Sequence, residues 1–273
     1  KRRVGYLFQD YALFPNMTVL QNILCGAGDR KKASEYVKRF FLEGKEQLYP
    51  AQLSGGQKQR TAMARMLAGE PEILMLDEPF TALDNYLKMQ LERELMKVME
   101  DYGKTVLFVS HDRNEAYRMT DRIAVMEDGQ ILDVQPKEEL FQNPASLAAT
   151  LLTGCKNVSM LLAESDGGYA ATDWGIRLSA PPEEGNYKYA AFRAHYFQVV
   201  PAMEATNVLE CHILRVIEDT LSTVILFCNG YRTGKHASEV LTYELPKEEW
   251  QKLKNTETLY LKMPPEQIIW LEK

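Results

Sequence analysis

The sequence lacks closely spaced cysteines. Its four cysteines, Cys25, Cys155, Cys211 and Cys228, lie far apart in a chain of 273 residues, and none of them forms a C-x-x-C pair. This spacing argues against both a disulfide framework and a zinc site. We therefore expect a protein of a reducing compartment, the cytosol.

The sequence also lacks a surplus of basic residues and a long apolar run. Lys and Arg number 32 against 38 Asp and Glu, which gives a formal net charge of −6. Nucleic-acid-binding proteins usually carry a basic surplus, so we expect no nucleic-acid partner. The longest apolar runs, such as Val224–Cys228, have the length of a strand. They fall well short of the ~18 residues of a membrane-spanning helix.

A hydrophobic share of 45% is enough for a substantial core, and the length suggests about two domains. Residues 1–145 alternate between strand and helix patterns. Short apolar runs at 73–76 and 106–109 are separated by a helical pattern that includes Leu91 and Leu95 and is ended by Gly103. Strand, helix and strand in this order predict a parallel sheet. Residues 12–70 contain little that resembles a strand and predict a helical subdomain within this α/β domain.

The pattern changes in the second half of the chain. A predicted hairpin around Asp128-Gly129 is followed, over residues 150–273, by short strand-like runs separated by turn residues. Several short strands of this kind predict a small barrel or sandwich. The clearest runs are Tyr189–Phe192, His212–Ile217, Thr223–Cys228, Leu259–Met263 and Gln267–Leu271.

The first element that can carry chemistry is Ser54-Gly55-Gly56-Gln57, within the string LSGGQKQR at the start of a predicted helix. Ser54 is a favoured N-cap. The two glycines allow a phosphate to approach the backbone closely. The N–H groups and positive dipole end of such a helix form an anion site. Ser-Gly-Gly alone is equally compatible with an ordinary helix start, whereas the whole string favours phosphate binding.

Three further elements follow the strand patterns. Asp77 and Glu78 come at the end of the run 73–76, where parallel sheets bind ligands, and carboxylate oxygens suit Mg²⁺. Taken alone, such a pair is more often a solvated turn. His111 ends the next predicted strand and should open onto the same sheet edge. Gln9 follows a short strand at the start of the chain and gains its weight from the other elements.

Together and in this order, these elements resemble the ATP-binding subunit of an ABC transporter. LSGGQKQR is similar to the family signature, ILMLDEP to the Walker B strand and Ala82-Leu83-Asp84 to the D-loop. His111 resembles the switch histidine and Gln9 the Q-loop glutamine. The run FQDYALFPNMTVLQNI is more similar to importers of inorganic ions, sugars and polyamines than to exporters.

The resemblance implies an α/β fold with a P-loop NTPase-type sheet and a helical subdomain over residues 1–145. It also implies a small, mostly β, OB-like barrel domain with a regulatory role over residues 150–273. The segment Thr153–Val158 resembles the linker into that domain and is closest to molybdate and sulfate systems.

The resemblance also implies a homodimer that encloses ATP and Mg²⁺. Ser54, Gly55, Gly56 and Gln57 of one subunit would cap the γ-phosphate of ATP held by the other. Asp77 and Gln9 would hold Mg²⁺.

Three further residues receive roles in the same way. Glu78 would orient and deprotonate the attacking water, and His111 would contact the γ-phosphate. Asp84 would lie across the dimer interface.

One motif of the family is absent. No glycine begins a G-x-x-x-x-G-K-[ST] phosphate loop, because Gly103-Lys104-Thr105 is preceded by Val98 at the position of the first glycine. The chain also opens just before the Q-loop strand. We therefore expect that the N-terminal part with the phosphate loop is missing, and that this chain alone binds ATP poorly and is inactive.

The function expected from the resemblance is an ATPase that powers import of a small solute, with molybdate as the leading cargo and sulfate next. Ferric iron, sugars and polyamines stay open as cargoes. The expected partners are permease subunits and, indirectly, a substrate-binding protein, at the cytoplasmic face of the membrane.

Two other classes of function stay open. One is a soluble ABC-type ATPase with no role in transport. The other is an oxyanion-sensing module over residues 150–273, in which Arg177, Lys188, Arg193 and His195 could contact an anion, although scattered surface charge is the simpler interpretation of these four residues.

Overall fold

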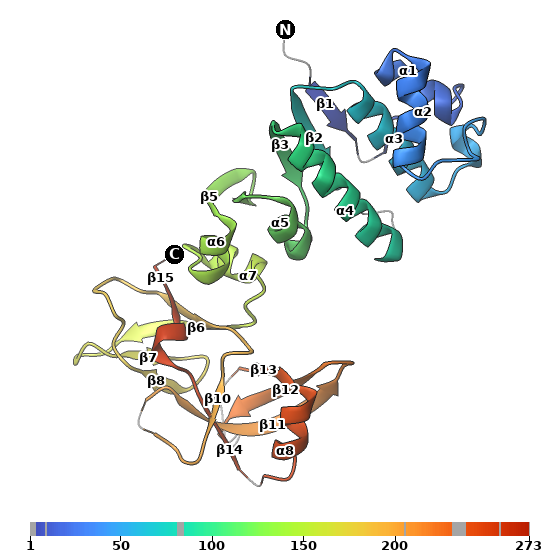
Figure 1. Cartoon of the computed structure of the whole chain (residues 1–273). Coiled ribbons are helices and arrows are strands. Elements are labelled where there is room, and N and C mark those ends of the chain that lie inside the picture. Colours follow the sequence, from blue (N-terminus) through green and yellow to red (C-terminus); the bar gives the residue numbers. More distant parts are fainter. Residues whose placement is uncertain are drawn as a thin grey trace. The chain divides into compact units, whose positions relative to one another are not determined.

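The computed structural model describes residues 4–8, 10–80, 85–204, 206–230, 239–256 and 258–272. Its internal contacts divide the chain into two compact units, residues 1–121 and 122–273 (Figure 1). This division falls earlier than the domain boundary near 145–150 that the sequence predicts, and the assignment of 1–145 and 150–273 as the two domains stays a prediction.

The first unit contains a three-stranded parallel sheet in the order β1-β2-β3. Between β1 and β2 the chain forms helices α1, α2 and α3, which are grouped beside the sheet in Figure 1. Helix α4 connects β2 to β3. The elements are β1 (Val4–Leu7), α1 (Val19–Ala27), α2 (Arg30–Arg39), the 3-10 helix η1 (Pro50–Gln52), α3 (Gly55–Ala68), β2 (Ile73–Asp77), α4 (Asn85–Tyr102), β3 (Thr105–Val109) and α5 (Arg113–Met119).

One face of this sheet forms the core of the first unit. Leu7, Leu74 and Leu76 are buried there together with Leu91 and Leu95 of α4, as the helical pattern predicts. Gly103 ends α4 with a positive φ of 57° and an N–H that donates to the carbonyl of Met99. A left-handed C-cap of this kind favours glycine.

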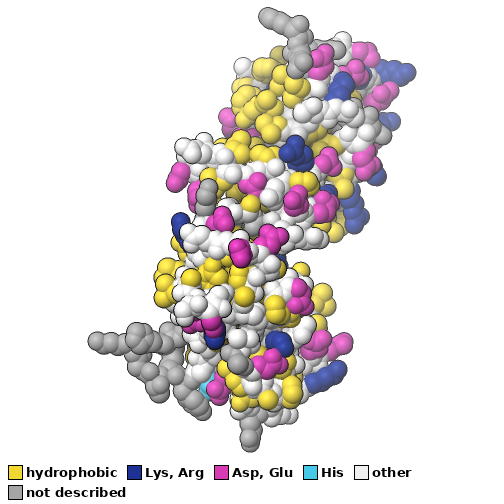
Figure 2. Space-filling view, turned by 90° about the vertical axis from the view of Figure 1, so that its left-hand side faces the viewer, with side chains coloured by type: hydrophobic (Ala, Val, Ile, Leu, Met, Phe, Trp, Pro, Cys, Tyr) yellow, Lys and Arg dark blue, Asp and Glu magenta, His cyan; other side chains and the backbone are white. Residues whose placement is uncertain are grey.

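Within the described residues, the other face of the sheet is partly exposed. Figure 2 shows hydrophobic side chains gathered at the surface of this unit. Parallel sheets are normally covered on both faces, so the exposed apolar residues are unusual. They are Val4, Tyr6 and Phe8 at β1 and Leu107 and Val109 on β3.

The second unit is mostly β structure. It begins with the hairpin β4 (Arg122–Glu127) and β5 (Gln130–Pro136), whose turn residues Asp128 and Gly129 both have a positive φ, as a type I′ turn requires. Two short helices, α6 (Lys137–Gln142) and α7 (Leu147–Leu152), follow. The fold class predicted from the sequence, α/β followed by a mostly β region, is confirmed.

The remaining strands form two five-stranded sheets, in the orders β10-β14-β11-β12-β13 and β15-β9-β6-β7-β8, around one shared core. The OB-like character of this region stays a prediction. Its elements are β6 (Asn157–Ala163), β7 (Tyr169–Ala171), β8 (Ile176–Leu178), β9 (Tyr189–Phe192), β10 (Gln198–Val200), β11 (Val208–Glu218), β12 (Ser222–Asn229), β13 (Leu241–Pro246), α8 (Lys247–Leu253), β14 (Leu259–Lys262), the 3-10 helix η2 (Pro265–Gln267) and β15 (Ile269–Leu271).

Candidate functional site

Two parallel strands bring the predicted catalytic residues to one edge of the sheet. Strand β2 ends at Asp77, which is paired in register with Val109, the last residue of β3. Glu78 continues from β2, and its N–H donates to the carbonyl of Val109 over 3.0 Å. His111 follows β3 by two positions. The three side chains therefore meet where open parallel sheets bind their ligands.

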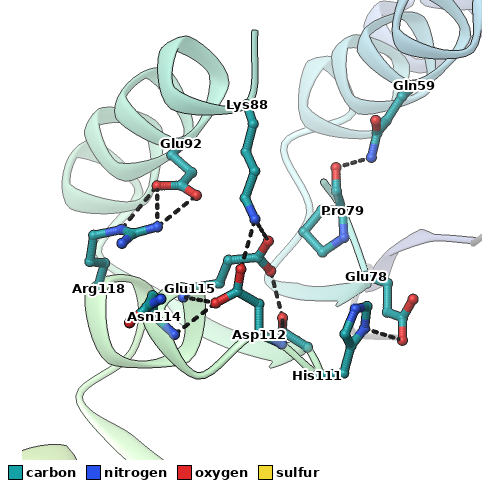
Figure 3. Close-up of polar contacts among 11 residues, drawn as sticks. Gln59, Glu78, Pro79, Lys88, Glu92, His111, Asp112, Asn114, Glu115 and Arg118 are labelled. Atoms are coloured by element: carbon teal, nitrogen blue, oxygen red, sulfur yellow. Dashed lines mark hydrogen bonds and ion pairs between the residues drawn. The ribbon is translucent and has the colours of Figure 1, made fainter. Parts of the chain in front are cut away.

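Glu78 and His111 are in direct contact. The Oε1 atom of Glu78 lies 3.0 Å from Nδ1 of His111 (Figure 3). An ionised carboxylate only accepts hydrogen bonds, so Nδ1 carries a proton in this pair. The ring of His111 is 72% exposed and the side chain of Glu78 is 26% exposed. The pair is open enough for a phosphate or a water to reach it.

The backbone at Glu78 is strained. Its φ is +46°, in the left-handed region that non-glycine residues rarely adopt. Conformations of this kind cost on the order of 1–3 kcal/mol and gather at active sites. Tyr11, Ala12, Phe41, Glu70, Asp128 and Asn207 also have a positive φ, so this conformation is consistent with a functional role of Glu78 and does not identify one by itself.

The side chain of Asp77 has a hydrogen-bond partner, Tyr6, that the sequence does not predict. The hydroxyl of Tyr6 donates to Oδ2 of Asp77 over 3.1 Å, and this hydrogen bond is the main cause that raises the pKa of Tyr6 above its ordinary value. The other carboxylate oxygen is left for a ligand. Groups of three or more His, Cys, Asp or Glu that could hold a metal do not occur in the part of the chain that the structure describes. A single carboxylate suits Mg²⁺, which usually keeps several waters and shares its shell with substrate phosphates.

The glycine-rich string lies at the start of α3, as predicted. Ser54 is the N-cap, and its Oγ accepts a hydrogen bond from the N–H of Gln57. The side chain of Gln57 accepts in return from the N–H of Ser54 over 3.0 Å, which completes a capping box. Ser54 and Gly55 are exposed and Gly56 is buried. This helix start presents its positive dipole end to solvent.

Two predicted site residues, Gln9 and Asp84, lie outside the described residues. The proposed roles of Gln9 at the metal and of Asp84 across a dimer interface stay predictions.

Several polar residues around the Glu78–His111 pair do not stand out in the sequence. The buried side chain of Gln59 donates to the carbonyl of Pro79, directly after Glu78. Lys88 forms ion pairs with Asp112 and Glu115, on the other side of His111 (Figure 3). No sequence spacing singles these residues out, because their partners lie on other elements.

Two arginines of the second unit, Arg177 and Arg193, have structural partners. Arg193 is buried and donates to the carbonyls of Phe141 and Thr153. Arg177 pairs with Glu164 and Asp166. These contacts favour the interpretation of these two arginines as structural residues over that of an anion site.

Comparison with known proteins agrees with the motifs. Residues 1–81 match the model of the ABC transporter family. These residues belong to an ABC transporter ATP-binding domain. The match contains the exposed start of α3 and both carboxylates at the end of β2, and His111 lies beyond it.

The chain is similar to importer subunits of several bacteria. It is 45% identical over 157 residues to the sulfate/thiosulfate import ATP-binding protein CysA of Bacillus cereus, a match that covers 53% of this chain and 44% of the relative. It is 42% identical over 194 residues to the protein of the same name from Xylella fastidiosa. This match covers 67% of this chain and 55% of the relative. An uncharacterized ABC transporter ATP-binding protein of Escherichia coli, YdcT, is 41% identical over 196 residues. This match covers 67% of this chain and 58% of the relative.

The chain thus spans about half the length of the curated relatives it matches. Among solved structures, a dimeric ATP-binding cassette bound to ADP and phosphate matches with 36% identity and a TM-score of 0.46, over 50% of this chain and 63% of that one. Among the residues that the structure describes, no helix has both the length and the apolar character needed to cross a membrane.

Proposed function

We propose that this chain is part of the ATP-hydrolysing subunit of an importer for a small oxyanion. The observation that carries the proposal is the contact between Glu78 and His111 beside Asp77, in a chain whose N-terminal residues belong to an ABC transporter ATP-binding domain. A carboxylate, a histidine and a metal-binding carboxylate on one sheet edge are suited to activating water against a phosphate.

In this proposal Glu78 orients the water that attacks the γ-phosphate of ATP and accepts its proton. His111 holds the carboxylate of Glu78 in place through Nδ1. A second proton, on Nε2, would let the same ring donate to the phosphate. Asp77 would hold Mg²⁺, which neutralises phosphate charge when it is bound.

The exposed start of α3 supports a role in trans. Ser54 and Gly55 are exposed at the positive dipole end of α3, and this position suits the γ-phosphate of ATP held by a second copy. The sequence contains no phosphate loop, so we assign no residue to the other phosphates. Two copies that close on ATP would drive permease subunits at the cytoplasmic face of the membrane, with a substrate-binding protein delivering the cargo.

For the cargo we propose sulfate or thiosulfate, because relatives that are 42–45% identical carry that name. Molybdate, the leading cargo expected from the sequence, is a related tetrahedral oxyanion and stays an alternative. Residues 150–273 would regulate transport.

Uptake measurements in cells that lack the gene test this proposal. We expect uptake of labelled sulfate and thiosulfate to fall, and to be restored by the intact gene but not by the same gene with Glu78→Gln. A fall in molybdate uptake alone would move the cargo to molybdate. Unchanged uptake of all three anions would contradict an oxyanion importer.

A further inference from the structure

A closed polar network flanks His111 on both sides. On α4, the ammonium of Lys88 lies 2.9 Å from Oδ2 of Asp112 and 2.5 Å from Oε1 of Glu115. The second oxygen of Glu115 accepts from the hydroxyl of Ser110 over 2.5 Å. That hydroxyl accepts in turn from the N–H of Asp112 over 3.0 Å. Ser110 and Asp112, the two neighbours of His111 in the chain, are therefore linked to one lysine. Figure 3 shows Lys88 between Asp112 and Glu115.

The charged groups of this network, Lys88, Asp112 and Glu115, stabilise one another. Glu115 is only 5% exposed, and a buried carboxylate requires a partner. Burial acts to lower the pKa of Lys88, but its hydrogen bonds to Glu115 and Asp112 outweigh burial and raise that pKa. The hydrogen bond from Lys88 is also the main cause that lowers the pKa of Asp112. The ammonium of Lys88 therefore stays protonated between the carboxylates of Asp112 and Glu115.

The position of the His111 ring depends on the backbone of residues 110–112 more than on the packing of neighbouring side chains. Its ring is 72% exposed, so few side chains confine it. Apart from the contact with Glu78, the ring is placed by the turn 110–112. Asp112 fixes this turn further, because its Oδ1 accepts from the N–H groups of Asn114 and Glu115 at the start of α5. A shift of Asp112 would move the Cα of His111 and change its distance to Glu78.

We propose that Lys88 is a positioning residue for His111. It does not touch the reacting atoms. It holds Ser110 and Asp112, through its ion pairs with Asp112 and Glu115, so that Nδ1 of His111 meets Glu78. Because Lys88 is the fourth residue of α4, which begins directly after residues 81–84, a displacement of the start of α4 would be passed to His111 through this lysine.

The same pair of helices contains a matched control. Arg118 of α5 forms a bidentate contact with Glu92 of α4, at 3.0 Å for both nitrogens. Glu92 is 6% exposed, nearly the same as Glu115. Arg118 thus joins α4 to α5 through a buried carboxylate as Lys88 does, but it does not contact either neighbour of His111. Replacing either Lys88 or Arg118 by methionine removes an ion pair to a buried glutamate. Only the replacement of Lys88 should loosen the turn 110–112 that contains His111.

The test compares Lys88→Met, Arg118→Met and Lys88→Arg. Its first readout does not depend on ATP hydrolysis. Spectra of ¹³C-labelled histidine rings show four residues, and the signal of His111 is assigned with His111→Gln. In this chain without nucleotide, we expect Lys88→Met to shift or broaden the His111 signal, Arg118→Met to leave it in place, and Lys88→Arg to restore it.

The second readout rests on the proposed function and uses the protein expressed from the intact gene. We expect Lys88→Met to lower kcat for ATP hydrolysis about tenfold or more with KM changed by less than about twofold, since small misplacements of catalytic groups have effects of this size. Arg118→Met should stay within about twofold of the unchanged protein. Lys88→Arg, which keeps the charge and the donors, should recover about half of kcat or more.

Two results would overturn the inference. One is an equal change of the His111 signal in Lys88→Met and Arg118→Met, which would make the ion pair an ordinary structural contact. The other is an unchanged His111 signal in a folded Lys88→Met. If the unchanged full-length protein hydrolyses no ATP, the proposed function fails, while the histidine spectra still decide the role of Lys88.

Discussion

Glu78 and His111 follow the ends of neighbouring parallel strands, and their side chains meet at 3.0 Å. The register pairs Asp77 with Val109, so the two residues are offset by one position along the sheet edge. The left-handed backbone of Glu78 accompanies this contact. The ring of His111 is 72% exposed, so a ligand at this sheet edge can reach the pair.

Replacing Ser54 separates helix capping from phosphate binding. Ser54→Ala removes the cap of α3 and should lower the free energy of unfolding by about 1 kcal/mol. Ser54→Asp keeps a capping oxygen and should retain the stability, while its negative charge should repel the γ-phosphate and lower ATP hydrolysis further than Ser54→Ala does. Denaturant unfolding and ATPase assays of both variants of the full-length protein check this. Equal activity in the two variants would contradict a phosphate contact at Ser54.

The stability of the first unit should fall in acid through Asp112. Lys88 lowers the pKa of this carboxyl in the folded state below its ordinary value of 3.8. The stabilisation is therefore present above the unfolded-state pKa and is lost as the pH falls through the folded-state pKa. Between about pH 5 and pH 3, Asp112→Asn should lose less thermal stability than the unchanged protein. Parallel melting curves over this range would contradict the ion pair.

Asn157 should be a major contributor to the stability of the second unit. Its buried amide donates to the carbonyls of Phe192 and Thr242 and accepts from the N–H of Thr242, which joins β6 and β9 of one sheet to β13 of the other. Asn157→Ala leaves buried backbone groups without partners and should lower the free energy of unfolding by about 2–4 kcal/mol. Gln198→Ala, on an exposed position of β10, serves as the control in denaturant unfolding. Equal losses in the two variants would argue against this role.

Local patterns were enough to predict much of the fold. The apolar runs that became β2 and β3, the glycine that ends α4 and the Asp128-Gly129 turn all carry signals within a few residues. The strands β6, β7, β8, β10 and β13 were not predicted, although β6 has seven residues and β13 has six. Their stability depends on pairing with strands that are distant in the sequence. Pairing with such partners leaves no periodic pattern in a short run.

The candidate site was predictable only where its residues stand in motifs. Asp77, Glu78 and His111 end apolar strands, and the parallel connection alone brings them to one edge. Tyr6, Gln59 and Lys88 have the same residue types as many surface positions. Their contacts with Asp77, Pro79 and Asp112 depend on the tertiary arrangement of sheet and helices.

In the proposed function, Glu78 activates water for ATP hydrolysis. ATP hydrolysis by the protein expressed from the intact gene should be measured with and without Glu78→Gln, because glutamine keeps the shape of the side chain but cannot accept the proton. We expect hydrolysis to fall about a hundredfold or more, with ATP-induced dimerisation retained. Normal hydrolysis by the Glu78→Gln protein would contradict this role of Glu78.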